Sequence, residues 1–120
     1  MANLFAMTVP ILPGQTEHWH KFMDALKGEK YNEFQANRAR LEVRERTFFQ
    51  QTPHGDFIVV TLEGNHPESA FGRFAEGNDA FTKWFVDEVK AIHGIDLASP
   101  PSRAMPELCV DSGEVNVSVY

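Results

Sequence analysis

The spacing of apolar residues predicts that the chain begins with a strand and continues into a helical region. Residues 4–12 form an apolar run without helical spacing, which indicates an extended segment. Apolar side chains then recur with the period of one helix face, at Trp19, Phe22, Met23 and Leu26. Gly28 interrupts this helix, and a second helical piece carries Tyr31 and Phe34, with Arg38 one turn beyond Phe34.

The middle of the chain reads as two strands joined by a tight turn. Residues 47–51 are extended in character, and residues 52–56 carry Pro and Gly, the residues of turns. The following strand, residues 57–62, is apolar almost without interruption. A strand covered on one face alternates apolar and polar residues, so this run predicts burial on both faces. Ile58, Val60 and Leu62 should share one face, and Phe57, Val59 and Thr61 the other.

A second helical region and a last extended region follow. Pro67 suits the first position of a helix, and a longer helix follows, with Gly94 at the position of a left-handed C-terminal residue. The apolar face of the longer helix is formed by Phe81, Trp84, Phe85, Val89 and Ile92. Residues 97–106 are a proline-rich connector, and residues 107–110 and 114–120 are extended in character, so we expect residues 107–110 to supply the last strand.

This order of elements predicts an α+β fold, a ferredoxin-like β-α-β-β-α-β sandwich whose helices cover one face of an antiparallel sheet. We expect a single domain over residues 1–112, followed by a C-terminal extended tail, residues 113–120. The other sheet face needs a cover that the chain does not contain. A second copy of the sheet is the simplest cover, which predicts a homodimer whose two sheets form an α+β barrel.

Composition narrows the possible partners. The chain has 120 residues, 17 of them acidic and 11 basic, for a net charge of −6, which disfavours nucleic acid as a partner. The arginines between residues 38 and 46 alternate with glutamates, as on a solvated edge. The single cysteine, Cys109, can form neither an intramolecular disulfide nor a thiolate zinc site, which fits a cytoplasmic location. No segment has the length of a membrane span, so no membrane association is expected.

Four motifs resemble the dimeric α+β barrel superfamily, and most closely an uncharacterised bacterial family within it. They are the helix over residues 19–27, the strand and turn over residues 49–57, the segment 62–67, and the pair Trp84-Phe85 with the sequence His-Gly-Ile-Asp at 93–96. The resemblance covers roughly residues 4–110. It implies the fold and the dimer, and little about the reaction, because the superfamily carries many chemistries on one scaffold.

Trp84 and His93 also resemble a pair found in the haem-degrading members of that superfamily. In those enzymes the two residues are ten apart, whereas here they are nine apart, which places them on opposite sides of an ideal helix. The asparagine of the first strand is replaced by Met7. We therefore expect no haem degradation and no cofactor. His18 and His20 point about 200° apart on a helix, so no metal site is expected.

The remaining hypothesis concerns a cavity between the helices and the sheet. Its expected aromatic lining is Tyr31, Phe34, Phe49, Phe81 and Trp84, with Arg38 and Arg46 as polar anchors. This predicts a homodimeric protein that binds a small apolar or aromatic molecule and, more narrowly, acts on it as a cofactor-free oxygenase. The alternative is a non-enzymatic stress-responsive or interaction protein in which the same aromatic side chains fill the core.

Overall fold

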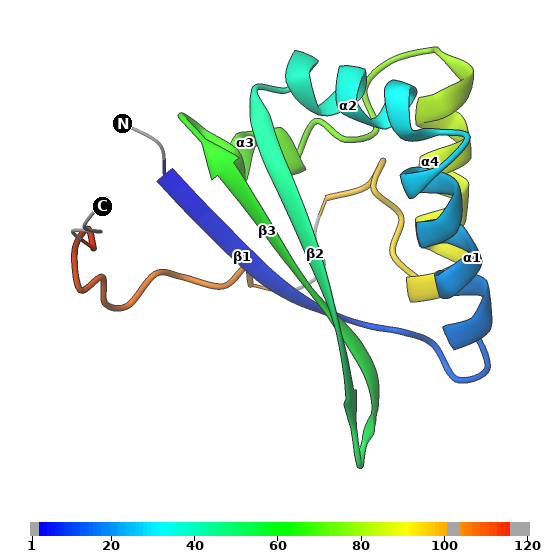
Figure 1. Ribbon diagram of the computed structural model, residues 1–120, viewed down its shortest axis with the longest axis horizontal. Helices are drawn as coiled ribbons and strands as arrows, with labels where there is room; N and C mark the ends of the chain where they lie inside the picture. Colours follow the sequence, from blue (N-terminus) through cyan, green and yellow to red (C-terminus); the bar gives the residue numbers. More distant parts are fainter. Residues whose placement is uncertain (1–2, 101–103, 116–120) are drawn as a thin grey trace, which may run out of the picture.

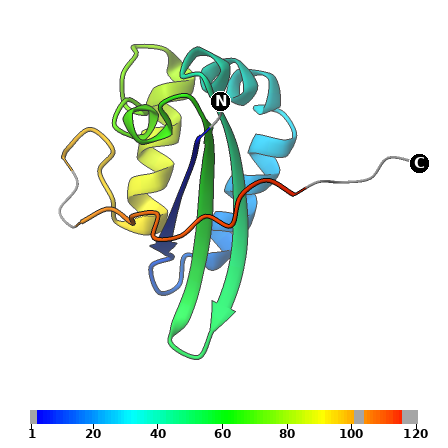
Figure 2. The same ribbon diagram turned by 90° about the vertical axis from the view of Figure 1, so that its left-hand side faces the viewer.

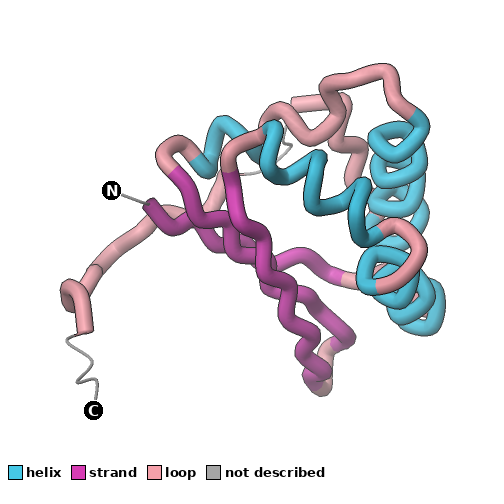
Figure 3. Tube along the Cα trace, turned by 45° about the horizontal axis from the view of Figure 1, so that its top comes forward, coloured by secondary structure: helices cyan, strands magenta, loops and turns pink. Residues whose placement is uncertain are grey.

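The computed structural model describes residues 3–100 and 104–115. The elements follow one another as strand β1 (Asn3–Pro10), helices α1 (Thr16–Lys27) and α2 (Tyr31–Arg40), strands β2 (Val43–Thr52) and β3 (Gly55–Gly64), and helices α3 (Pro67–Phe71) and α4 (Ala80–His93). Figure 1 shows the sheet on one side and α1, α2 and α4 on the other. Figure 3 shows the same division into strands and helices from above. The chain is therefore an α+β structure compatible with a ferredoxin-like fold.

The sheet is antiparallel and has three strands in the order β1-β3-β2. The central strand β3 pairs with β1 from Asn3↔Gly64 to Pro10↔Phe57, and with β2 from Val43↔Gly64 to Thr52↔Gly55. Only two residues separate β2 from β3, and Gly55 has a positive φ of 128°. Such a backbone favours glycine, and it lets the strands reverse direction in a short turn.

One face of the central strand is buried within the chain, as its sequence predicts, and burial of the other face by a second subunit stays a prediction. Ile58, Val60 and Leu62 are buried against the helices. They join the core with Met7 and Val9 of β1 and the apolar faces of α1 and α4. The intervening side chains Phe57, Val59 and Thr61 are half-buried on the opposite face of the sheet.

We call this opposite face the open face. It consists of the side chains of Leu4, Ala6, Thr8, Arg44, Arg46, Phe48, Phe57, Val59, Thr61 and Glu63, which alternate with the inward residues along the strands. Figure 2 looks onto this side, with the described tail running in front of the strands. Phe48 remains 56% exposed, so a large aromatic side chain on this face has no cover within the described chain.

The prediction of a last strand at residues 107–110 is wrong for the described chain. Residues 104–115 form no strand and are all exposed, with Leu108 75% and Val110 84% exposed. Figures 1 and 2 show them on the side of the sheet opposite the helices. Two alternating apolar residues gain little from pairing unless their side chains also cover an apolar surface. The β-α-β-β-α order is thus present without a fourth described strand.

Candidate ligand-binding site

A small inner cavity lies between the helices and the sheet. Its volume is about 60 Å³, room for about two water molecules. Met7, Val9, Ile58 and Val60 form its sheet side, because successive inward residues of β1 and β3 share a face. Trp19, Phe22, Met23 and Leu26 of α1 and Phe85 and Val89 of α4 form its helix side. The cavity is therefore enclosed mainly by apolar side chains from four elements.

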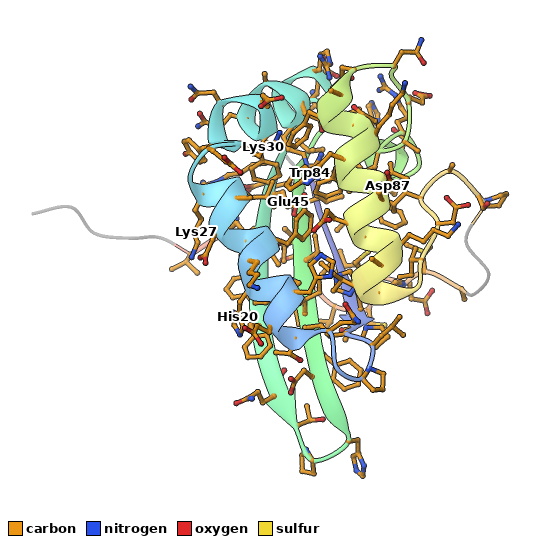
Figure 4. The ribbon with its side chains drawn as sticks, turned by 90° about the vertical axis from the view of Figure 1, so that its right-hand side faces the viewer. His20, Lys27, Lys30, Glu45, Trp84 and Asp87 are labelled. Atoms are coloured by element: carbon orange, nitrogen blue, oxygen red, sulfur yellow. The ribbon has the colours of Figure 1, made fainter. Side chains whose placement is uncertain are left out.

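Glu45 and Thr47 bring polar atoms to this cavity from β2. The Glu45 side chain is only 8% exposed, and its Oε1 accepts a hydrogen bond of 2.8 Å from Arg38 Nε. Its Oε2 accepts one of 2.9 Å from the Thr47 hydroxyl. Figure 4, which views the molecule from the helix side, shows Glu45 behind the space between α1 and α4. A carboxylate thus lies in the core, compensated by a guanidinium and fixed in orientation by a hydroxyl.

Arg38 reaches this carboxylate from α2 through an aromatic enclosure. Its guanidinium carbon lies 4.1 Å from the ring centroid of Phe74, 4.6 Å from that of Phe85 and 4.9 Å from that of Phe34. The residue is 4% exposed, and one of its terminal nitrogens also donates to Asn37 Oδ1. The other terminal nitrogen is buried and has no hydrogen-bond partner among the described residues. Faces of aromatic rings attract a cation, which offsets part of its desolvation.

Trp19 contributes an unpaired donor to the cavity wall. Its indole stacks on Phe49, with ring centroids 5.0 Å apart and planes 20° apart. The residue is 5% exposed, and its Nε1 has no hydrogen-bond partner in the described part of the chain. A buried donor without an acceptor costs about 1–3 kcal/mol. An acceptor atom bound in this cavity would recover that free energy.

His93 brings an imidazole to the cavity from the end of α4. Its Nδ1 lies 2.8 Å from the carbonyl oxygen of Pro10, so Nδ1 carries the proton and donates it to that oxygen. This tautomer leaves Nε2 as an acceptor. Burial lowers the pKa of His93 because it disfavours the charged imidazolium, and the hydrogen bond to Pro10 opposes this only in part. His93 is therefore a neutral base near pH 7.

A larger outer groove lies beside β1. Its volume is about 740 Å³, and it is bounded by β1, by Phe71 and Gly72, and by the segments 94–100 and 104–106. Most of its lining is apolar, including Ile95, Leu97 and Met105, while Asp96 and Ser99 add polar atoms. Asp96 is half-buried, and hydrogen bonds from the Ala98 amide and the Ser99 hydroxyl hold its pKa below the ordinary value.

The groove and the inner cavity share part of their walls. Met7, Val9, Phe71, Ile95 and Leu97 line both hollows. The groove lies along β1, and the cavity extends from these shared residues to Glu45 and Thr47 on β2. The two hollows therefore adjoin one another, with the apolar groove outside and the polar groups at the far end of the cavity.

The residues that the sequence suggests as a pocket lining do not come together. Tyr31 is exposed on α2, where Gln35 donates a hydrogen bond to its hydroxyl. Arg46 lies on the open face, 3.5 Å from Glu63. It is thus on the other side of the sheet from Arg38, and the two arginines cannot anchor one ligand in a single cavity.

The predicted aromatic residues lie around the helices rather than around one cavity. Phe34 packs on Arg38, and Phe49 packs on Trp19. Phe81 is buried beside Trp84, and Trp84 also lies under the ammonium group of Lys30, 5.3 Å from its ring centroid (Figure 4). None of the predicted residues is among the lining residues of either hollow. Their ligand-binding role stays a prediction.

Sequence reasoning missed Trp19, Glu45, Thr47 and His93 as a group. The sequence could have indicated two of them, because alternate residues of a strand point to the same side of the sheet. Val43 of β2 is buried, so Glu45, Thr47 and Phe49 also point inward. No sequence signal brings Trp19 of α1 and His93 of α4 to the same cavity. That proximity depends on how the helices pack on the sheet.

The described residues contain no cluster of three or more His, Cys, Asp or Glu side chains arranged to hold a metal ion. Within the same residues, no helix is both long enough and apolar enough to span a bilayer. No protein family, no curated protein and no solved structure matches this chain significantly. The groove and the cavity are therefore the features that point to a function.

Proposed function

We propose that this chain is a homodimeric protein of the dimeric α+β barrel type that binds a small apolar or aromatic compound. The observation that carries the proposal is the adjoining groove and cavity, which share five apolar wall residues. Ligand sites are usually concave and apolar, with a few placed polar groups, and a volume of about 300–1,000 Å³ is common. The groove has this size, and the cavity supplies the polar groups.

The small cavity volume favours a ligand whose body stays mostly in the groove. Only a narrow part of such a ligand would enter the cavity, past the shared wall. Met7 and Met23 line the cavity and are unbranched, so a change of rotamer can widen it. In the alternative function, an interaction protein with a filled core, the cavity does not widen and no ligand enters it.

The open face supports the dimer. Leu4, Ala6, Phe48, Phe57 and Val59 place apolar side chains on a sheet face that no described helix covers. An isologous dimer would bury these side chains against their own copies. Dimerisation through this face leaves the helix side, and with it the inner cavity, available to a ligand.

His93 supports the narrower proposal of a cofactor-free oxygenase. Neutral Nε2 would accept the hydroxyl proton of a dihydroxyarene, and the resulting anion is a better electron donor to O2. One oxygen atom of O2 would enter the ring and the other would leave as water. The substrate supplies all the electrons and becomes a hydroxyquinone, so no cofactor is needed.

Binding is tested by isothermal titration calorimetry with 2-naphthol, p-cresol and toluene. We expect saturable binding of one ligand per chain, and a Met7→Trp substitution, which fills the shared wall, should abolish it. Circular dichroism verifies that the variant is folded. If none of the probes binds to the wild-type chain, the binding proposal is overturned and the filled-core alternative is favoured.

The oxygenase proposal has its own assay. With 1,4-dihydroxynaphthalene, oxygen uptake should exceed the uncatalysed rate, and mass spectrometry with ¹⁸O2 should find one labelled atom in the product. His93→Asn retains a donor for the Pro10 carbonyl and removes the base, so it should return the rate to background. Oxygen uptake equal to background in the wild-type protein would remove the oxygenase and leave the binding proposal intact.

A further inference from the structure

We infer that Trp19, Glu45 and Thr47 form a specificity site for a hydroxyl group, so that the preferred ligand class is a small hydroxylated aromatic compound such as a phenol or naphthol. We call these residues the polar corner. The inference rests on the proposed binding function and makes it more specific, because an apolar groove alone would accept an aromatic hydrocarbon equally well.

The donor of the polar corner is the indole N–H of Trp19. It is buried, it belongs to a residue that lines the cavity, and it has no hydrogen-bond partner among residues 3–100 and 104–115. Buried polar atoms in folded proteins nearly always have a partner from the protein, from water or from a ligand. The partner required here is an acceptor small enough to enter the cavity.

The acceptors of the polar corner are oxygen atoms on β2. Glu45 Oε1 and Oε2 each accept one hydrogen bond from the protein, and each oxygen can accept another. The Thr47 hydroxyl gives its proton to Glu45, so its oxygen is left only as an acceptor for a ligand. Arg38 acts as a positioning residue, because its Nε fixes the carboxylate on the other side.

The donor and the acceptors line the same small cavity. Trp19 stacks directly on Phe49, which follows Thr47 by two residues in the inward row of β2. The cavity that Trp19, Thr47 and Glu45 all line has a volume of only about 60 Å³, so a ligand group inside it is offered both the indole donor and these oxygen acceptors. A hydroxyl is the small neutral group that can accept from Trp19 and donate to one of these oxygens at once.

The apolar lining of the cavity and the groove determines which body the hydroxylated ligand can have. Phe22 and Phe85 line the cavity beside the polar corner, and Met7 and Val9 continue the apolar surface to the groove. The Glu45 charge is already compensated by Arg38, so the corner has no net charge to attract an ion. A neutral aryl group with one hydroxyl is therefore favoured over an aromatic acid or an amine.

The test compares matched ligand pairs that differ by one hydroxyl: p-cresol with toluene, and 2-naphthol with naphthalene. Dissociation constants are measured by calorimetry for the full chain and for three variants. Trp19→Phe removes the donor and keeps a ring to stack on Phe49, while Trp84→Phe is the matched control at a tryptophan that lines neither hollow. Thr47→Val is a second variant that removes an acceptor with little change in shape.

We expect the wild-type chain and Trp84→Phe to bind each hydroxylated ligand about tenfold more tightly than its hydrocarbon partner. Trp19→Phe and Thr47→Val should lose most of this preference while still binding the hydrocarbons. Equal binding of both members of a pair by the wild-type chain overturns the polar corner and leaves the proposed function standing. A preference that survives in both Trp19→Phe and Thr47→Val overturns it as well, whereas absence of all binding defeats the proposed function itself.

Discussion

At the scale of single residues, the main feature of this protein is the charge that it holds inside its core. Arg38 and Glu45 are almost fully buried and are joined by a hydrogen bond of 2.8 Å. Removing both charges from water is costly, and the geometry of the pair and the surrounding aromatic rings offset this cost. A core pair of this kind is sensitive to the loss of either partner.

Glu45→Gln should lower the free energy of unfolding by about 3 kcal/mol, because it leaves the Arg38 charge buried without a counter-charge. Urea unfolding followed by circular dichroism measures this. The matched control is Glu63→Gln, whose partner Arg46 is half-exposed on the open face, so a change below about 1 kcal/mol is expected there. Equal effects of the two substitutions would contradict the buried role of Glu45.

A second residue-scale prediction concerns His93 and pH. Its pKa is lowered in the folded protein by burial, below the ordinary value of 6.5. Above pH 6.5 both states carry neutral His93, and below it the unfolded chain takes up a proton more readily than the folded chain does. The free energy of unfolding should therefore fall as the pH drops below 6.5, until the lowered pKa is reached.

Urea unfolding between pH 8 and pH 5 tests this. His93→Asn should flatten part of the decline, because asparagine can donate to the Pro10 carbonyl and does not titrate. His54→Asn, at an exposed position in the turn between β2 and β3, serves as the control and should leave the pH profile unchanged. A wild-type profile that His93→Asn does not alter would show that His93 is readily protonated in the folded state.

At the scale of elements, α4 combines well-defined ends with a role in the site. Asp79 accepts hydrogen bonds from the Thr82 amide (3.1 Å) and the Thr82 hydroxyl (2.8 Å), and these bonds lower the pKa of Asp79. At the other end, Gly94 has a positive φ of 70°, which favours glycine. These ends fix the length of α4, and with it the position of His93 beside Pro10.

Asp79→Ala should destabilise the protein by about 1 kcal/mol, the usual effect of losing a side-chain cap. Asp79→Ser is the matched control, since serine can accept the same hydrogen bond from the Thr82 amide. Both variants are measured by thermal or urea unfolding at pH 7. If Asp79→Ser is as unstable as Asp79→Ala, the loss does not arise from capping.

At the scale of the whole molecule, no described helix covers the open face. Dimerisation through this face is the proposal that light scattering tests directly. Phe48→Glu places a charge in the apolar part of the face and should convert a micromolar dimer into a folded monomer. Tyr31→Glu changes a similarly exposed aromatic on α2, away from the sheet, and should remain dimeric. A wild-type monomer at micromolar concentration would sink the dimer proposal.

The tail gives a second prediction at this scale. The sequence alternates apolar residues at Val115, Val117 and Val119, which is typical of a strand; Val115 is 81% exposed, and Val117 and Val119 lie outside the described residues. We expect residues 114–120 to add to the dimer contact through this alternation. Deleting residues 113–120 should then raise the dimer dissociation constant measured by dilution. An unchanged constant means that the tail plays no part in assembly.

The sequence by itself determined the elements and their order. The apolar faces of α1 and α4, the tight turn before β3, the inward row Ile58, Val60 and Leu62 and the left-handed Gly94 are correctly predicted, whereas burial of Phe57, Val59 and Thr61 stays a prediction. These features depend on residue period and backbone preference, which act over a few neighbouring residues. The strand expected at residues 107–110 is absent from the described chain, because two alternating apolar residues are a short and weak strand signal.

Only the tertiary structure decided which side chains meet. The two-residue period of a strand places Arg46 on one face of the sheet and Glu45 on the other. The sequence does not say which of these faces the helices cover. The structure places Arg46 on the open face, away from the helices and from Arg38. The cavity exists where side chains from α1, α4 and the sheet fail to fill the space between them. Such a space depends on the summed volumes and rotamers of residues far apart in the chain. Trp19, Glu45 and His93 line one cavity for that reason, and no local sequence pattern predicts it.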